Sequence, residues 1–205
     1  MYLTKLKLPL SSPNVRAALH DSQKMHRMVT GFFGTDRKRA DLLYRSRIRG
    51  VFAELYLYSE QPVNPERLFP GMGPVAQREL SFWLASMEAG QVYSFQLLTA
   101  PFKKVAEEGA KNSRRRALRT QEERLAWLER KAEQGGFRIL SVQETPGEKK
   151  TAVHPAERGG RLTVDAWCYD GHLVITDADA FRRSFREGIG PGKAYGLGML
   201  LLAGG

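Results

Sequence analysis

The chain has 205 residues, of which 42% are apolar and 26% charged, and this composition excludes a disordered protein and favours a globular one. Lys and Arg outnumber Asp and Glu by 32 to 22, which gives a formal net charge of +10. Such an excess favours a polyanionic partner, either a nucleic acid or an anionic membrane surface, with a basic surface that has no partner as the alternative.

Two further features narrow the class of protein. The sequence has no apolar run near the roughly 20 residues that a membrane-spanning helix needs. Its N-terminus alternates apolar and polar residues instead of forming a secretory signal. Cys168 is the single cysteine, so an intramolecular disulfide and a zinc site built on cysteines are both excluded. We therefore predict a protein of the reducing cytoplasm with no membrane partner.

Apolar periodicity predicts the elements of residues 1–89. Leucines alternate with lysines over residues 5–10, as in a half-buried strand. Pro13 interrupts this pattern, and a helix with an apolar stripe over residues 25–32 follows, capped by Asp21 or Ser22. The remaining elements are strands over 42–48 and 51–58, a short helix near 65–69 and a strand over 80–84.

Residues 90–205 repeat this order. A strand over 93–97 precedes a helix over 121–134, which a capping box of Thr120 and Glu123 opens. The remaining elements are a strand over 137–142, a polar loop, a hairpin of strands 162–169 and 172–176 that turns at Asp170 and Gly171, a helix over 177–186 and a strand within 193–202. Two successive split βαβ units predict an α+β protein with two tandem ferredoxin-like domains and antiparallel sheets, with domain bounds 1–89 and 90–205.

The segment from residue 101 to residue 119 is strongly basic. It contains two acidic residues, Glu107 and Glu108, and its glycine, asparagine and serine residues predict a loop or hairpin. Its seven basic residues are Lys103, Lys104, Lys111, Arg114, Arg115, Arg116 and Arg119. A charge run of this kind is often only solvated surface, but its self-repulsion favours contact with RNA or DNA. A second basic group over residues 37–49 is less specific.

A glycine-rich segment joins the last predicted helix to the last strand. Residues 188–198 contain five glycines, which permit a close approach of the backbone to a ligand. The spacing of a Walker loop is absent, and the segment precedes a strand instead of opening a helix. A phosphate-binding loop and a packing turn both fit this pattern.

Among the four histidines, His20, His26, His154 and His172, only His26 lies beside the apolar stripe of a predicted helix. Lys24 and Arg27 flank it and would help to hold a phosphate. A structural histidine is the alternative. No cluster of histidines, cysteine and carboxylates in the sequence suggests a metal site. From the residues alone, the prediction is a basic two-domain protein that binds RNA.

An ordered set of segments carries a resemblance to a known family. The segments are MYLTKL at residues 1–6, MHR at 25–27, YSFQL at 93–97, APFK at 100–103, ERLAWLERK at 123–131 and GIGPGKAYGLGMLL at 188–201. Together they resemble the CasE family, the CRISPR RNA endonuclease of the type I-E Cascade complex. The resemblance spans nearly the whole chain, apart from residues 59–78 and 145–160.

The resemblance implies two ferredoxin-like domains and cleavage of repeat RNA 3′ of its stem. The catalytic histidine of the family falls on His26, and Gln23 stands where some members have a tyrosine. The basic segment corresponds to the projection that enters the groove of the RNA stem, and Gly190, Gly192 and Lys193 lie beside the RNA. No cofactor or metal is implied.

Cleavage of RNA without a metal uses the 2′-hydroxyl of the substrate as nucleophile, and it needs a group that titrates near neutral pH together with cations. His26 fits the first role, as base, acid or orienting group. Lys24, Arg27, or Lys149 and Lys150 from the polar loop fit the second. The implied partners are the CRISPR repeat stem-loop RNA and other Cascade subunits, with no DNA contact by the isolated protein. A non-catalytic RNA-binding subunit is the alternative function.

Overall fold

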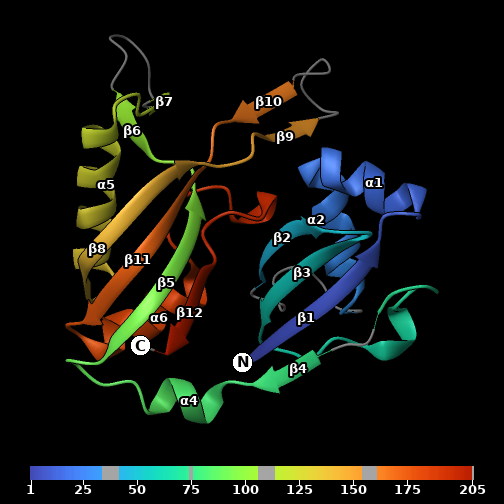
Figure 1. The fold of residues 1–205 in the computed structure, drawn as a ribbon, viewed down its shortest axis with the longest axis horizontal. Helices are drawn as coiled ribbons and strands as arrows, with labels where there is room; N and C mark the ends of the chain where they lie inside the picture. Colours follow the sequence, from blue (N-terminus) through green and yellow to red (C-terminus); the bar gives the residue numbers. More distant parts are fainter. Residues whose placement is uncertain (34–41, 74–75, 106–113, 154–160, 205) are drawn as a thin grey trace.

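The computed structural model describes residues 1–33, 42–73, 76–105, 114–153 and 161–204, and it contains two four-stranded antiparallel sheets that lie side by side (Figure 1). The first sheet is formed by β1 (Tyr2–Pro9), β2 (Leu43–Arg49), β3 (Phe52–Ser59) and β4 (Ala76–Glu79), in the order β2-β3-β1-β4. The second is formed by β5 (Val92–Thr99), β8 (Phe137–Pro146), β11 (Trp167–Ile175) and β12 (Leu200–Gly204), in the order β12-β5-β11-β8.

Both sheets place the first and third strands of a βαββαβ unit in the centre. This order and the helices packed on one face of each sheet are those of ferredoxin-like domains, so the predicted fold class is confirmed. The helices are α1 (Pro13–His20) and α2 (Ser22–Gly31) on the first sheet and α5 (Gln121–Gln134) and α6 (Ala178–Glu187) on the second. A single turn of 3₁₀ helix, η1 (Pro65–Arg67), occupies the place of a second helix on the first sheet.

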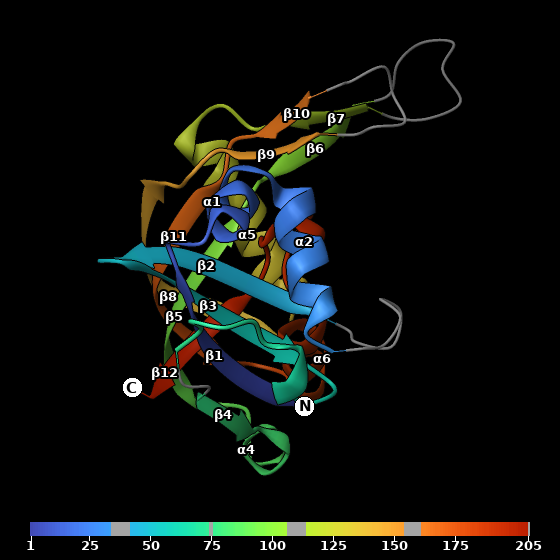
Figure 2. The same ribbon diagram turned by 90° about the vertical axis from the view of Figure 1, so that its right-hand side faces the viewer.

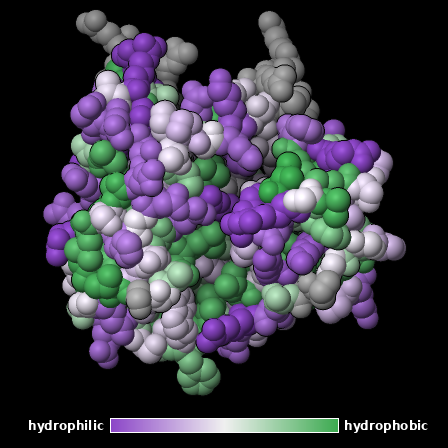
Figure 3. Space-filling view, viewed as in Figure 1, coloured by the Kyte–Doolittle hydropathy of each residue, from purple (hydrophilic) through white to green (hydrophobic). Residues whose placement is uncertain are grey.

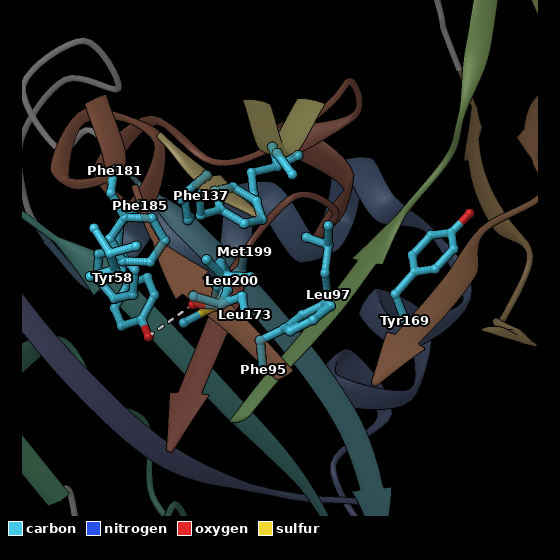
Figure 4. Packing of buried hydrophobic residues seen from close by; sticks show 14 of the residues in the cluster. Tyr58, Phe95, Leu97, Phe137, Tyr169, Leu173, Phe181, Phe185, Met199 and Leu200 are labelled. Atoms are coloured by element: carbon cyan, nitrogen blue, oxygen red, sulfur yellow. Dashed lines mark hydrogen bonds between the residues drawn. The ribbon is translucent and has the colours of Figure 1, made fainter. Parts of the chain in front are cut away.

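One hydrophobic cluster joins the two sheets. Tyr58 of β3 packs its ring 4.6 Å from that of Phe185 of α6, and its hydroxyl donates to the carbonyl of Leu200 at 3.2 Å (Figure 4). Met1 and Leu43 also belong to this cluster, together with residues of the second sheet. The two halves of the chain therefore share a core, and the domain boundary near residue 90 stays a prediction.

The predicted strand over 80–84 is wrong. Residues Ser81–Ala85 form the helix α4, and the strand β4 precedes it. Leu80, Leu84 and Met87 are buried at helical spacing, whereas Phe82 is 91% exposed. Alternating hydrophobicity therefore gave the wrong period, because Phe82 does not enter the core. The strand β4 itself gave no signal, since all four of its residues are exposed.

The predicted hairpin at Asp170 and Gly171 is also wrong. Both residues lie inside the continuous strand β11, which pairs with β5 on one side and β8 on the other. A Cβ atom at residue 171 would overlap the carbonyl oxygen of Ser141 on β8. The glycine thus permits a close approach between neighbouring strands next to a register shift at His172, and it does not form a turn.

Several smaller predictions are corrected. Pro13 begins the helix α1 rather than only interrupting the chain, because Ser12 caps this helix and Pro13 occupies its first turn. The predicted strand over 137–142 continues to Pro146, and the polar loop after it contains β9 (Lys150–Val153). The predicted strand over 162–169 is divided between β10 (Arg161–Val164), which pairs with β9, and the start of β11. The last strand begins at Leu200, and the 3₁₀ turn η2 (Lys193–Tyr195) precedes it.

Other predictions are confirmed closely. Strands β2 and β3 form the predicted hairpin, which turns at Gly50 and Val51, and α5 runs over the predicted residues, with the Thr120 hydroxyl accepting from the amide of Glu123 at 3.2 Å. The basic segment forms a hairpin of β6 (Phe102–Val105) and β7 (Arg114–Ala117).

In the part of the chain that the structure describes, no helix is both long and apolar enough to cross a membrane.

Candidate functional site

His26 lies on α2, which packs on the first sheet. Asp21 caps this helix by accepting a hydrogen bond from the amide of Gln23 at 2.9 Å, and Met25 and Val29 bury its apolar side against the sheet. His26 is half-buried as a residue, both nitrogens of its ring are buried, and the ring lies against that of Tyr44, with centroids 6.3 Å apart and an angle of 29° between the ring planes. The helix and β2 together therefore fix the imidazole.

Tyr44 connects His26 to the glycine-rich segment. It is 2% exposed, and its hydroxyl donates to the backbone carbonyl of Ala194 in η2 at 2.8 Å. Burial raises the pKa of Tyr44 above its ordinary value, so the phenol keeps its proton near neutral pH. The consecutive elements α2 and β2 thus meet η2, which lies far from both in the sequence, at one place.

Backbone and side-chain contacts hold the glycine-rich segment in place. Its two ends meet where the amide of Ile189 donates to the carbonyl of Gly198 at 2.8 Å, and the hydroxyl of Thr99 donates to the carbonyl of Ile189 at 3.2 Å. Gly190 has a φ of +84°, and a side chain there would meet the ring of Trp127 at 2.9 Å. A glycine is required at residue 190 for both its conformation and its packing.

A basic hollow of about 630 Å³ lies between the glycine-rich segment, α5 and β6. Gly190 and Lys193 line it from the first of these, and Lys103 and Lys104 line it from β6. Arg130 and Lys131 contribute two further positive charges from α5, and none of the described residues that line the hollow is acidic. The hollow therefore presents five cations, an arrangement suited to a phosphate backbone.

Arg130 and Lys131 were missed by the analysis of the sequence, although a signal for them existed. Trp127, Arg130, Lys131 and Gln134 follow one another at helical spacing on α5 and all line the hollow. A basic face on a well-capped helix next to the basic segment would have pointed to them. Both residues stand in the ERLAWLERK segment that carries the family resemblance, but no binding role was assigned to them, since charged helix faces are common.

The basic hairpin of β6 and β7 extends beyond the upper end of the second sheet in Figure 1. The surface over it is mainly hydrophilic (Figure 3). Lys103 and Lys104 lie on β6 and Arg116 on β7, all exposed, and Lys103 pairs across the hairpin with Arg116. The backbone of residues 114 and 115 lies on β7 as predicted, and Lys111 lies outside the described residues. The structure thus projects the basic residues that it describes on one hairpin.

Polar contacts hold the base of this hairpin. Glu123 accepts from Lys103 at 2.8 Å and from the backbone amide of the exposed Arg119 at 3.1 Å. The hydrogen bond from Lys103 lowers the pKa of Glu123 to about 2, so this carboxylate is ionised near neutral pH. Arg124, which is buried, donates to the carbonyl of Arg119 at 2.8 Å and forms an ion pair with the buried Glu144.

Lys150 begins β9, and its segment lies next to the helix of His26. Both β9 and η2 pack against α2, and Figure 2 shows β9 above this end of the first sheet. The ammonium group of Lys150 lies 3.3 Å from the carboxylate of Glu148. The structure therefore brings the segments of His26, Lys150 and Lys193 together.

Lys24 and Arg27 lie on a different face of α2. Both line a shallow hollow against α1, together with Asn14 and Ala17. With 100° per residue along a helix, Lys24 lies roughly 160° around α2 from His26. The structure does not bring Lys24 to the side of the helix where His26 meets Tyr44.

The described residues contain no group of three or more His, Cys, Asp and Glu residues that could hold a metal ion. Among the other histidines, His172 lies exposed on β11, with its Nδ1 3.0 Å from the hydroxyl of Ser141. His20 ends α1, and His154 lies outside the described residues.

Comparison with known proteins gives concordant results. Residues 1–204 match the family described as CRISPR associated protein. The CRISPR-associated endoribonuclease Cse3 of Thermus thermophilus is 32% identical over a 215-residue alignment, which covers 99% of this chain and 100% of that protein. The Cascade subunit CasE of Escherichia coli is 35% identical over 81 residues, 40% of this chain and 39% of that protein.

A solved structure shares the whole fold. The CRISPR endoribonuclease Cse3 bound to a 19-nucleotide RNA has a TM-score of 0.84 and 30% identity, and the match covers 99% of this chain and 100% of that chain. The arrangement of the two sheets and their helices is therefore common to both proteins.

Proposed function

The chain belongs to the CRISPR associated protein family, as a CasE-type member, and we propose that it is an endoribonuclease that processes CRISPR repeat RNA. It recognises the stem-loop of the repeat and cleaves 3′ of the stem, which releases guide RNA for a type I-E Cascade complex. The endoribonuclease name of a relative that covers nearly the whole chain supports the reaction, and the RNA bound to the similar solved structure supports the class of substrate.

One observation carries the proposal. His26 lies against Tyr44, which holds η2 through Ala194, and η2 begins with Lys193 of the basic hollow. A group able to transfer protons is thus linked through Tyr44 and η2 to a surface suited to a phosphate backbone. A protein that only binds RNA needs the hollow but does not need the histidine.

The proposed chemistry uses no metal. The 2′-oxygen of the nucleotide 5′ of the cut attacks the adjacent phosphorus, the P–O5′ bond breaks, and the products are a 2′,3′-cyclic phosphate and a 5′-hydroxyl. One proton leaves the 2′-hydroxyl and one is added to the O5′ atom, and His26 assists one of these transfers. Cations stabilise the negative charge that develops on the phosphate oxygens.

Lys150 and Lys193 are the candidates that we favour over Lys24 for this stabilisation, because their segments pack against the helix of His26 whereas Lys24 lines a hollow against α1. Arg27 lines the same hollow as Lys24 and is a weaker candidate for the same reason. We propose that the residues of the basic hairpin and of the glycine-rich segment, with Arg130 and Lys131, bind the stem. Lys111, Arg114 and Arg115, whose side chains the structure does not describe, and the exposed Arg119 belong to this proposed surface by their place in the sequence of the basic segment.

The name of the Escherichia coli relative, a Cascade subunit, supports other Cascade subunits as partners. The proposed substrate is a cellular transcript, which places the reaction in the cytoplasm. The isolated protein is not expected to bind DNA.

A cleavage assay tests the proposal. We would incubate the protein with end-labelled repeat RNA in EDTA, and with the same RNA that carries a single 2′-deoxynucleotide on the 5′ side of the cut. A discrete product from the first RNA and none from the second support the proposed reaction, because the deoxynucleotide removes the nucleophile. Binding without any product in either metal-free or Mg²⁺-containing buffer would instead identify a non-catalytic RNA-binding subunit.

A further inference from the structure

A second charged hollow adjoins the basic hollow at Lys193. Its volume is about 510 Å³, and it lies between the C-terminal half of α6, the start of β2 and the glycine-rich segment. Three cations, Arg183, Arg186 and Lys193, and two carboxylates, Glu60 and Glu187, line this α6 hollow. Of the described residues, Lys193 alone lines both hollows, so it stands between them.

The helix α6 presents charged residues to this hollow because its apolar side is buried. Phe181 and Phe185 are fully buried in the shared core, where Phe185 packs on Tyr58 (Figure 4). Arg183 lies roughly 200° around the helix from each phenylalanine and is exposed. Ser184 lines the basic hollow, whereas Arg183 lines the α6 hollow. The two hollows therefore lie on neighbouring sides of the same helix.

The α6 hollow also borders the contact between His26 and Tyr44. Leu43 lines the hollow and directly precedes Tyr44, whose ring lies against that of His26. Lys193 directly precedes Ala194, whose carbonyl accepts the hydrogen bond from Tyr44. A strand of RNA that leaves the basic hollow across Lys193 would therefore pass the segment that Tyr44 holds and enter the α6 hollow.

On the basis of the proposed function, we propose that the α6 hollow binds the backbone of the single-stranded RNA on the 3′ side of the cut, which leaves as the product with the 5′-hydroxyl. The basic hollow is proposed to bind the stem, and the phosphate that is cut follows the stem on its 3′ strand. The same strand, continued past the cut, leads away from the stem. The 5′ flank belongs to the opposite strand of the stem and has no need to cross Lys193.

The charges of the α6 hollow suit a strand that is bound and then released. Arg186 forms an ion pair with Glu60 at 3.8 Å, whereas Arg183 and Lys193 have no ion pair with another described residue and can contact phosphates. The basic hollow presents five cations and no carboxylate from the described residues, so it attracts a backbone more strongly. The stem is thus held firmly and the 3′ strand weakly, which allows the 3′ product to leave after the cut.

Three RNAs with the same stem-loop test this inference. The first ends one nucleotide after the cut, the second continues for several nucleotides on the 3′ side, and the third carries the same extension at its 5′ end. A 2′-deoxynucleotide on the 5′ side of the cut keeps all three intact. We would measure their affinities over a series of salt concentrations for the wild-type protein, Arg183→Ala, Glu187→Gln and the control Arg138→Ala. Arg138 is exposed on β8 and lines neither hollow.

The gain in affinity from the 3′ extension, taken for each protein against its own short RNA, is the quantity of interest. In the wild type, the extension should steepen the slope of log affinity against log salt concentration by roughly 0.7 for each contacted phosphate, which is roughly 2.6-fold in affinity between 50 and 200 mM salt. Arg183→Ala should reduce this gain, because it removes a cation from the α6 hollow. Glu187→Gln should enlarge it, because it removes a carboxylate, and Arg138→Ala should keep it.

Three outcomes would overturn the site and leave the proposed function standing, since the stem would still be bound. They are no gain from the 3′ extension in the wild type, an equal or larger gain from the 5′ extension, and the same gain in Arg183→Ala as in the wild type. A wild-type protein that binds none of the three RNAs would overturn the proposed function as well.

Discussion

The imidazole of His26 on α2 and the phenol of Tyr44 on β2 lie against each other, with ring centroids 6.3 Å apart. The phenol in turn holds η2 through the carbonyl of Ala194. Tyr44 thereby connects α2, which carries His26, to η2, which carries Lys193.

Replacement of His26 by alanine should abolish most cleavage and leave binding intact. We expect His26→Ala to reduce the single-turnover rate by about 10²–10⁴-fold, the usual effect of losing a general acid or base. Affinity for the stem-loop should change little, because the basic hollow and hairpin remain. His20→Ala and His172→Ala serve as controls and should cut nearly normally. A wild-type rate for His26→Ala, or a requirement for Mg²⁺, would contradict the proposed mechanism.

The hydroxyl of Tyr44 should matter for cleavage beyond its effect on stability. Tyr44→Phe keeps the ring beside His26 but leaves the carbonyl of Ala194 without its donor, so η2 should lose its fixed distance from α2. Tyr58→Phe is a matched control, since Tyr58 also donates a hydrogen bond from a buried hydroxyl to a backbone carbonyl. Both variants should unfold more easily, by about 1–3 kcal/mol in urea titrations. Only Tyr44→Phe should slow cleavage, by several-fold, and equal rates for the two variants would argue against a tie between η2 and His26.

The basic hairpin should determine how affinity depends on salt. Replacement of Arg114, Arg115 and Arg116 by alanine should weaken binding of the stem-loop and lower the slope of log affinity against log salt concentration. Each phosphate contact releases roughly 0.7–0.9 of a counterion from the RNA, and this release is lost together with the contact. The variant Arg67→Ala with Arg78→Ala removes exposed positive charges elsewhere and should keep the slope. Fluorescence anisotropy over a series of salt concentrations measures both quantities. An unchanged slope in the triple variant would identify the run as solvated surface.

The ion pair of Arg124 and Glu144 should be a main support of the hairpin base. Its two hydrogen bonds measure 2.8 and 2.7 Å, both side chains are almost fully buried, and the guanidinium lies 3.4 Å from the ring centre of Trp167. Glu144→Ala should reduce the free energy of unfolding by about 3–5 kcal/mol, because it leaves a buried charge without its partner. The double variant Arg124→Met with Glu144→Leu should recover part of this loss in urea unfolding. Additive losses in the double variant would show that the two side chains act independently.

Acid should weaken the first sheet through Glu54. This carboxylate accepts from Lys5 at 2.7 Å and from Arg47 at 3.0 Å, and the hydrogen bond from Lys5 is the largest cause that lowers its pKa from 4.5 to about 2. A depressed pKa in the folded state contributes stability that is present above pH 4.5 and is lost as the pH falls toward 2. Glu54→Gln should therefore be less stable than the wild type at pH 7, and the difference should shrink between pH 4.5 and 2. Thermal unfolding at several pH values measures this, and a constant difference would refute it.

The sequence by itself predicted correctly where a helix begins when a residue at that end caps it with a side-chain hydrogen bond. The capping box at Thr120 set the start of α5 and Asp177 set that of α6, because a cap acts through residues that are adjacent in the chain. The resemblance to the CasE family, carried by short motifs, placed the fold and singled out His26. A local pattern failed where the decisive contact came from a distant segment. The sequence predicts a turn at Gly171, but this glycine permits the close approach of Ser141 on the neighbouring strand. The sequence also predicts a strand over residues 80–84, but Phe82 lies outside the core.

Which cations lie near His26 or line the basic hollow was decided by the tertiary structure. Lys24 is two residues from His26 in the sequence, yet the helix turns it toward α1, whereas Lys150 and Lys193 reach the neighbourhood of α2 through the packing of β9 and η2. Proximity along a helix gives no proximity in space unless residues share a face, since successive side chains differ by roughly 100°. Arg130 and Lys131 join the hollow for the complementary reason: α5 packs one face beside the glycine-rich segment, and only that packing distinguishes these two cations from the other charges on its surface.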